Sequence, residues 1–121
     1  MAWNFTADKP IYIQIAEMLK RDILSGKYQA GDRLPTVRDL ASEAAVNPNT
    51  MQKAFSELEQ EGLISTQRTA GRTVTTDSNA LAGARKQMLE ELTRDYLEKI
   101  YQMGSNKEDA VQFIEKLKGD L

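Results

Sequence analysis

The sequence of 121 residues predicts a mainly α-helical protein that carries one small β hairpin. Residues 36–62 have the pattern of two short helices joined by a tight turn, and residues 63–76 then change to the residue types and period of strands. Helical spacing returns from residue 77 onward. We therefore expect one small domain over residues 1–76, followed by a two-helix hairpin over residues 77–121.

The composition argues against several classes of function. The chain has no Cys and no His, which removes disulfides, the commonest general base and most transition-metal sites. Its carboxylates and lysines show no recognisable catalytic spacing, so we expect no enzyme, no cofactor and no metal. No apolar run approaches the roughly 20 residues that span a bilayer, and the N-terminus lacks a secretory signal. We expect a cytoplasmic protein that does not contact a membrane.

The first expected helix covers residues 10–25 and ends before a glycine. Its apolar face, at helical spacing, consists of Ile11, Ile15, Met18, Leu19 and Ile23. We place Tyr12 and Gln14 away from the centre of that face. Trp3 and Phe5 lie in an otherwise polar segment before the helix, and we expect them to fold back onto the domain.

Residues 27–35 form a connecting turn, and Thr36 follows as a helix cap. The helix after Thr36 extends to about residue 43. The next helix begins at Asn47, a favoured N-cap, and Pro48 suits its first position because that N–H has no partner within the helix. It ends at Gly62. Each helix has an apolar stripe that faces a core, made of Val37, Leu40, Ala41 and Ala44 in one and of Met51, Ala54, Phe55 and Leu58 in the other.

The outer side of the second helix carries hydrogen-bonding side chains in its first turn and a half, at Asn49, Thr50, Gln52 and Lys53. This composition is expected of a helix N-terminus in the major groove of DNA, where Asn and Gln bond adenine and Thr meets a methyl group or a phosphate. A capped, solvated surface helix in an ordinary helical domain has the same composition. The helix-turn-helix interpretation therefore depends on its flanks.

Two short strands are predicted after Gly62, over residues 63–68 and 72–76, with the hairpin tip between them. Arg68 and Arg72 stand on the two sides of the tip. A hairpin in this place resembles the wing of a winged helix, which lies along the DNA backbone or enters a minor groove. A surface hairpin with solvated arginines is the alternative, and the preceding helix-turn-helix favours the wing.

The net charge of −2 does not by itself indicate nucleic-acid binding. The local arrangement is more informative, because basic residues gather at the expected turns, second helix and hairpin, at Arg33, Arg38, Lys53, Arg68 and Arg72. Acidic residues fall at the far end of the second helix, at Glu57, Glu59 and Glu61. This distribution predicts modest non-specific affinity for DNA and a strong dependence on salt.

Residues 77–121 predict two helices, one capped by Asp77 or Ser78 and one capped by Ser105 with Glu108 as its capping-box partner. Two helices are too small to hold a core of their own, so their apolar stripes need a partner. They pack either on the N-terminal domain or on the same hairpin of a second chain. We favour a homodimer, because two-fold dimers match palindromic DNA sites. The expected interface residues are Leu81, Met88, Leu92, Tyr96, Ile100, Ile114 and Leu117.

Four blocks occur together in one order and spacing, namely P-I-Y-x-Q-I-A (10–16), G-D-R-L-P-T-V-R-D-L-A (31–41), V-N-P-N-T (46–50) and L-E-Q-E-G-L-I (58–64). Through them residues 9–76 resemble the DNA-binding domain of the GntR family of bacterial transcription regulators. The N-P-N-T form and the short tail resemble its YtrA-type subfamily. The hairpin departs from the usual R-G-x-G-T-F-V of the family, since residues 68–74 are R-T-A-G-R-T-V. Pro48 also stands where other subfamilies often carry Arg.

The resemblance implies roles for individual residues. The DNA base-reading set is Arg38, Asn49, Thr50 and Gln52. The set expected at the DNA backbone is Arg33, Thr36, Val37 and Lys53, to which we add Asn47 and Tyr12, although an exposed Tyr at a helix edge more often only packs. The wing set is Arg68, Gly71 and Arg72.

We therefore expect a homodimeric winged-helix transcription regulator that acts as a repressor, covering a palindromic operator in double-stranded DNA and blocking polymerase. A small-molecule effector would change the spacing of the two DNA-reading domains through residues 75–79. By resemblance, the subfamily often controls a nearby transporter operon. Two other classes stay open: a winged helix that binds proteins and not DNA, and a helical module that binds a small molecule or lipid between Tyr96, Tyr101, Met103 and Phe113.

Overall fold

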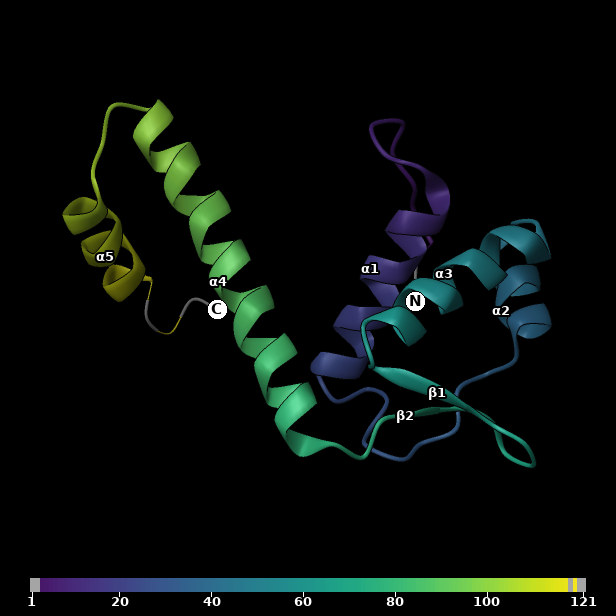
Figure 1. Cartoon of the computed structure of the whole chain (residues 1–121). Coiled ribbons are helices and arrows are strands. Elements are labelled where there is room, and N and C mark those ends of the chain that lie inside the picture. Colours follow the sequence, from purple (N-terminus) through teal and green to yellow (C-terminus); the bar gives the residue numbers. More distant parts are fainter. Residues whose placement is uncertain (1–2, 118, 120–121) are drawn as a thin grey trace. The chain divides into compact units, whose positions relative to one another are not determined.

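The computed structural model describes residues 3–117 and 119 (Figure 1). Its mainly helical fold with one two-stranded hairpin confirms the predicted fold class. The chain divides into two compact units, one ending at Gly83 and the other beginning at Ala84, so the division falls inside a helix. The elements are α1 (Ile11–Leu24), α2 (Val37–Ala44), α3 (Pro48–Gln60), β1 (Ile64–Gln67), β2 (Gly71–Val74), α4 (Ser78–Gln102) and α5 (Lys107–Lys116).

Helix α3 is the centre of the first unit, and both α1 and α2 pack against it. The predicted apolar stripe of α3 is fully buried, at Met51, Ala54, Phe55 and Leu58. Ile15 and Leu19 of α1 are also without exposed surface. Burying a side chain of this size stabilises a fold by about 1.5–3 kcal/mol. This packing fixes the rotation of α3 about its axis and leaves its polar side in solvent.

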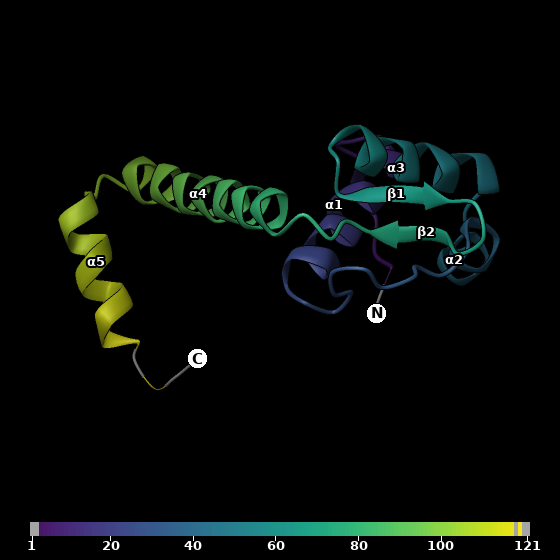
Figure 2. The same cartoon turned by 60° about the horizontal axis from the view of Figure 1, so that its bottom comes forward.

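The hairpin is an antiparallel pair in which Ile64 lies opposite Val74 and Gln67 lies opposite Gly71 (Figure 2). Strand β1 is one residue shorter than predicted at each end, whereas β2 ends two residues earlier than predicted and begins one residue earlier, at Gly71. Gly71 has a φ of 71°, a left-handed conformation that glycine adopts without steric cost. The chain reverses into β2 at this residue, which explains why glycine is present at the tip.

The connection between α1 and α2 is more than a turn, because it pairs with the outer edge of β2. The N–H of Leu34 donates to the carbonyl of Arg72 at 2.9 Å, and the N–H of Val74 donates to the carbonyl of Asp32 at 2.9 Å. These bonds tie the chain just before α2 to the hairpin. The start of α2 is therefore held at a fixed place beside the wing.

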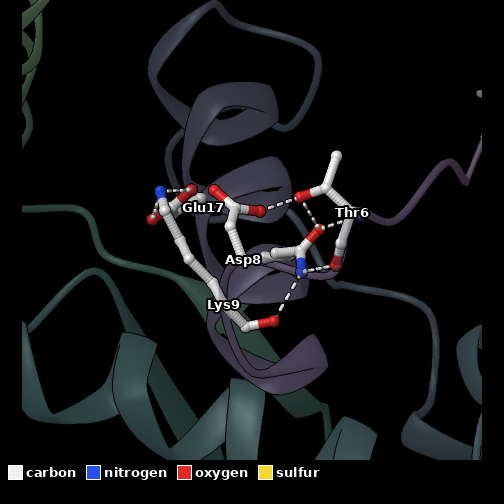
Figure 3. Close-up of polar contacts among 5 residues, drawn as sticks. Thr6, Asp8, Lys9 and Glu17 are labelled. Carbon is white, nitrogen blue, oxygen red and sulfur yellow. Dashed lines mark hydrogen bonds and ion pairs between the residues drawn. The ribbon is translucent and has the colours of Figure 1, made fainter.

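Gln14 was expected away from the centre of the apolar face, but the sequence did not predict that the N-terminal segment buries it. The side chain is 9% exposed. Its Oε1 accepts from the N–H of Thr6 at 2.9 Å, while its Nε2 donates to the carbonyls of Thr6 and Lys9 at 2.9 and 2.8 Å (Figure 3). Gln14 thus occupies the interior because backbone groups satisfy its amide. Ile11, expected on the apolar face, is instead 42% exposed.

The segment before α1 folds back onto the unit, as predicted. The rings of Trp3 and Phe5 lie 6.4 Å apart, and both side chains are partly buried. The indole N–H of Trp3 donates to the carboxylate of Glu43, in α2, at 3.3 Å. The Nζ of Lys9 pairs with Glu17 of α1 at 3.1 Å (Figure 3). The N-terminal segment therefore contacts both α1 and α2.

The caps of the last two helices are Asp77 and Asn106. The carboxylate of Asp77 accepts from two first-turn N–H groups of α4, at 3.0 and 3.2 Å. Ser105 was the expected cap of α5, and the structure corrects this: the side chain of Asn106 accepts from the N–H of Asp109 at 2.8 Å. Asn106 is the last residue with extended backbone before the helix. The hydroxyl of Ser105 instead donates to the carboxylate of Asp109.

Helices α4 and α5 leave most of their apolar side chains in solvent. Within α4, every residue of which the structure describes, no side chain is buried, and within α5 the buried residue is Ala110. Leu92 and Ile114 are 55% and 56% exposed. A Cβ added to Gly83, inside α4, would meet no atom within 4 Å. Among the described residues, no helix combines the length and the apolar character needed to cross a membrane.

Candidate nucleic-acid interface

Helices α2 and α3 are joined by a tight turn, which makes a helix-turn-helix. Ala45 follows α2 with φ 56° and ψ 46°, a left-handed conformation that residues with a Cβ rarely adopt. The N–H of Val46 donates to the carbonyl of Ala41 at 3.0 Å and closes the turn. Because α2 packs on α3, the strained turn is held in place by the contacts on both sides of it.

Both helices of the motif begin at the caps that the sequence predicted. The hydroxyl of Thr36 accepts from the N–H of Asp39 at 3.1 Å, and Oδ1 of Asn47 accepts from the N–H of Asn49 at 2.7 Å. Pro48 occupies the first turn of α3. Helix N-termini carry partial positive charge and N–H groups without partners in the helix, so both ends favour an anion such as phosphate.

The outer side of α3 is open to solvent. Asn49, Gln52 and Lys53 are exposed, and Thr50 is partly exposed. All four lie in the first turn and a half, away from the buried stripe that packs on α1 and α2. A convex helix N-terminus with amide, hydroxyl and ammonium groups has the shape and the hydrogen-bonding groups needed to enter a major groove.

A small hollow of about 80 Å³ lies at the N-terminus of α2, beside the hairpin. It brings together members of the predicted backbone set and of the predicted wing set. Arg33 is exposed on one side, and Arg38, which is also exposed, follows in the first turn of α2. The residues that line the hollow are Arg33, Leu34, Pro35, Thr36, Val37, Phe55, Gly71 and Arg72.

Tyr12 and Lys53, both predicted at the DNA backbone, lie next to each other. The Nζ of Lys53 is 5.6 Å from the centre of the Tyr12 ring, within the distance at which a cation is attracted to an aromatic face. Tyr12 is partly buried at the edge of α1. Its ring therefore helps to hold the ammonium group of Lys53 at the rim of α3.

The two arginines of the wing have different environments. Arg68 is exposed at the turn after β1, and no ion pair of it occurs among residues 3–117 and 119. Arg72, predicted as part of the wing, is paired within the protein: its Nε donates to Glu59 of α3 at 3.0 Å, and its Nη2 donates to Gln52 at 3.1 Å. Its guanidinium carbon lies 5.2 Å from the centre of the Phe55 ring.

Two of the three acidic residues at the C-terminal end of α3 form ion pairs, so less uncompensated negative charge remains there than the composition suggested. Glu59 is paired with Arg72, and Glu61 is paired with Lys20 of α1 at 3.0 Å. Sequence reasoning missed Glu59 and Phe55 as partners of the wing. The alternation of the hairpin was the available signal, because Thr66 and Arg72 are opposite each other on one face of the pair.

Comparisons with known proteins agree with this architecture. Residues 11–74 match the model of the family described as bacterial regulatory proteins, gntR family. The matched range begins with α1 and ends with β2, so it contains the helix-turn-helix and its wing. The HTH-type transcriptional repressor YtrA of Bacillus subtilis is 34% identical over 113 residues, which are 93% of this chain and 87% of the relative.

Two solved structures share the fold over most of their length. A GntR family transcriptional regulator from Listeria monocytogenes superimposes with a TM-score of 0.84 at 36% identity, covering 93% of this chain and 98% of the other. YtrA from Sulfolobus acidocaldarius, a GntR-family transcription factor, gives a TM-score of 0.59 at 27% identity and covers 100% and 98%. The chain therefore belongs to the GntR family of bacterial transcription regulators, a family of DNA-binding winged helix-turn-helix proteins, and is of the YtrA type.

Proposed function

We propose that this regulator is a homodimeric repressor that binds a palindromic operator, with residues 1–76 reading DNA and residues 77–121 dimerising. One observation carries the proposal: the chain exposes a polar helix N-terminus on α3 and, separately, apolar side chains along α4 and α5. The first suits a major groove, and the second suits a protein partner, because large exposed apolar patches mark interaction sites. That a similar protein is named a repressor supports the sign of regulation.

In this proposal Arg38, Asn49, Thr50 and Gln52 contact bases. Arg38 is exposed at the start of α2, and an arginine can bond the O6 and N7 atoms of guanine together. Asn47 uses its side-chain oxygen to cap α3, which leaves its NH₂ group as a donor for phosphate. The other backbone contacts are Arg33, Thr36, Val37, Lys53 and Tyr12, with Arg68, Gly71 and Arg72 as the wing.

The dimer would be formed by the apolar side chains of α4 and α5. Leu92, Tyr96, Ile114 and Leu117 are exposed in the single chain, while the other three residues of the proposed interface are partly exposed. Two copies of this hairpin would remove such surface from water, and binding two half-sites at once multiplies affinity without new contacts to DNA. The remaining members are Leu81, Met88 and Ile100.

The oligomeric state is testable by sedimentation equilibrium. We expect a dimer at micromolar concentration for the wild type, a monomer for Leu92→Asp, and a dimer for the control Gln87→Asp, which adds the same single negative charge at an exposed polar position of α4. Each variant should keep the helix content of the wild type. A wild type that still sediments as a monomer at about 100 micromolar protein would contradict the dimer.

Repression would follow from occlusion, since a dimer on a site near a promoter blocks polymerase in the cytoplasm. A small-molecule effector would act by changing the separation of the two DNA-reading domains, through residues 75–79, which comprise the connection after β2 and the first two residues of α4. A neighbouring transporter operon is the proposed target, by resemblance to the subfamily. Operator affinity that no cell extract changes would remove the effector from this proposal.

The central experiment selects bound sites from random DNA duplexes at two salt concentrations. The wild type should enrich a palindrome, and Arg38→Ala should lose preference at one base in each half-site while keeping non-specific binding. The matched control Arg21→Ala removes an exposed arginine of α1 outside the proposed site and should enrich the same palindrome as the wild type. Enrichment of no sequence by the wild type would favour the alternative, a winged helix that binds proteins and not DNA.

A further inference from the structure

We propose that Arg72 does not bind DNA itself. Instead, it determines which base Gln52 of α3 prefers to contact. This inference depends on the proposed role of Gln52 as a base-reading residue. It starts from the hydrogen bond between Nη2 of Arg72 and Oε1 of Gln52, at 3.1 Å, which joins the wing to the exposed side of α3. Arg72 is a positioning residue in this scheme.

Arg72 is held in place from three sides. Its Nε donates to Oε1 of Glu59 at 3.0 Å, and its guanidinium lies over the buried ring of Phe55. The hydroxyl of Thr66, opposite Arg72 in the hairpin, donates to the same oxygen of Glu59 at 2.9 Å. A carboxylate, a ring and an amide thus hold the guanidinium beside α3, and its Nε and Nη2 both donate within the protein.

The pairing with Glu59 also neutralises the charge of Arg72. The Arg72 side chain is 25% exposed and the Glu59 side chain is 36% exposed, so the ion pair lies half within the protein surface. If Arg72 left Glu59 to contact a phosphate, the Glu59 carboxylate would face the DNA without a cation. Repulsion between that carboxylate and the phosphates favours the paired arrangement when DNA is bound.

The donor chemistry of Arg72 fixes the orientation of the Gln52 amide. A guanidinium carries only hydrogen-bond donors, so the atom of Gln52 that faces it must be the amide oxygen. The NH₂ group of Gln52 is then the end left for DNA. Gln52 therefore presents its NH₂ group to the groove, while Arg72 occupies one of the two lone pairs of its oxygen and competes with the DNA for that oxygen.

A glutamine whose oxygen is held by Arg72 should favour a different base from a glutamine whose oxygen and NH₂ group are both free. Adenine offers an acceptor and a donor in the major groove, and a glutamine pairs with both only when its oxygen and its nitrogen are available. Guanine offers two acceptors, and thymine offers the O4 acceptor. We therefore infer that Gln52 selects guanine or thymine, whereas an unrestrained glutamine would bind adenine.

The test compares sites selected from random duplexes by the wild type, Gln52→Ala and Arg72→Ala. The position read by Gln52 is the one at which Gln52→Ala loses preference. The wild type should prefer guanine or thymine there, and Arg72→Ala should accept adenine, with the discrimination against adenine falling roughly fivefold to tenfold. A wild-type preference for adenine at this position, or an unchanged preference in Arg72→Ala, would overturn the inference.

The salt dependence of binding gives a second and independent readout. Log affinity falls linearly as log salt rises, and each lysine or arginine that neutralises a phosphate contributes about 0.9 to the magnitude of this slope. The slopes compared below are magnitudes. Arg68→Ala is the matched control on the same hairpin, and if Arg68 contacts a phosphate this variant should lower the slope by about that amount. The double variant Arg72→Ala/Glu59→Gln, which also removes the carboxylate that Arg72 neutralises, should leave the slope unchanged. A lower slope for this double variant with the base preference of the wild type would mean that Arg72 is a phosphate contact.

A conservative variant serves as a control for misfolding. Arg72→Lys keeps a cation for Glu59, but its single ammonium lacks the planar fork that reaches Glu59 and Gln52 together. It should relax the preference at the Gln52 position in the same direction as Arg72→Ala, with the thermal midpoint of the wild type nearly retained. Enrichment of no site by the wild type would remove the proposed function as well, whereas an adenine-reading Gln52 would overturn this inference alone.

Discussion

Replacing Gln14 with Leu should loosen the N-terminal segment while keeping the buried volume almost constant. The substitution removes three hydrogen bonds to backbone groups, namely the N–H and carbonyl of Thr6 and the carbonyl of Lys9, and a longer one from the hydroxyl of Thr6 at 3.4 Å. Bonds of this kind contribute about 0.5–1.5 kcal/mol each after exchange with water. Thr6 and Lys9 are exposed, so water can satisfy their backbone groups once the segment loosens. We therefore expect a loss of about 2 kcal/mol, toward the lower part of the summed range.

Trp3 makes this loss visible, because it is the single tryptophan of the chain and lies in the segment that Gln14 holds. In Gln14→Leu the fluorescence of the native protein should shift to the red as the indole becomes more exposed. The urea midpoint should fall at the same time, measured at one fixed protein concentration because association changes apparent stability.

Gln14→Glu is the matched variant, since it keeps an acceptor for the Thr6 N–H. It also turns a carboxylate toward two carbonyl oxygens, so it should be at least as destabilising as Leu at neutral pH. Acidification that protonates this carboxyl restores a donor and should recover part of the loss. A Leu variant with the fluorescence and urea midpoint of the wild type would refute the reasoning.

Substitutions at three further positions test the turn, the cap and the partly buried Tyr28. Ala45→Gly should raise stability by about 0.5 kcal/mol, because the left-handed conformation costs a residue with a Cβ about 1–2 kcal/mol and glycine loses about 0.5–1 kcal/mol in extra chain entropy; an unchanged urea midpoint would contradict this. Asn47→Ala should lower stability by about 1 kcal/mol and Asn47→Asp should not, since only the second keeps an acceptor for the N–H of Asn49; equal midpoints would show that the cap adds nothing. Burial raises the pKa of Tyr28 above its ordinary value of 10.0, so the folded state favours the protonated phenol. The stabilisation is complete below pH 10 and is lost as the pH rises through the higher folded pKa; Tyr28→Phe should therefore lose less stability than the wild type in alkaline urea titrations, and parallel losses would exclude this role of Tyr28.

The elements that the sequence predicted well are those with a strong local signal. The apolar stripe of α3 repeats at three and four residues and is bounded by Asn47-Pro48 and Gly62, so periodicity, cap and stop agree. The hairpin is recognised from a change of period. These signals lie within a few residues of one another, which is why helix ends were correct to within one or two residues.

The features that were missed depend on contacts between distant or unexpected partners. The burial of Gln14 was not predicted because its partners are backbone groups, which no side-chain pattern reports. Arg72 looked like a free charge because Glu59 is 13 residues away in the sequence. Ser105 and Asn106 are adjacent residues of similar capping tendency, and only backbone angles distinguish them. In each case the missing information was three-dimensional.

Gly83 makes α4 easier to bend near one point of its length. A helix of 25 residues is about 38 Å long, and swinging such a rod by about 5° moves its far end by about 3 Å, close to one base-pair step. Glycine is the residue that weakens a helix interior most after proline, and here no neighbour requires the missing side chain. Bending compliance in α4 is therefore concentrated near one residue, at the boundary between the two units. A stiffer alanine there would narrow the range of half-site spacings that a dimer tolerates.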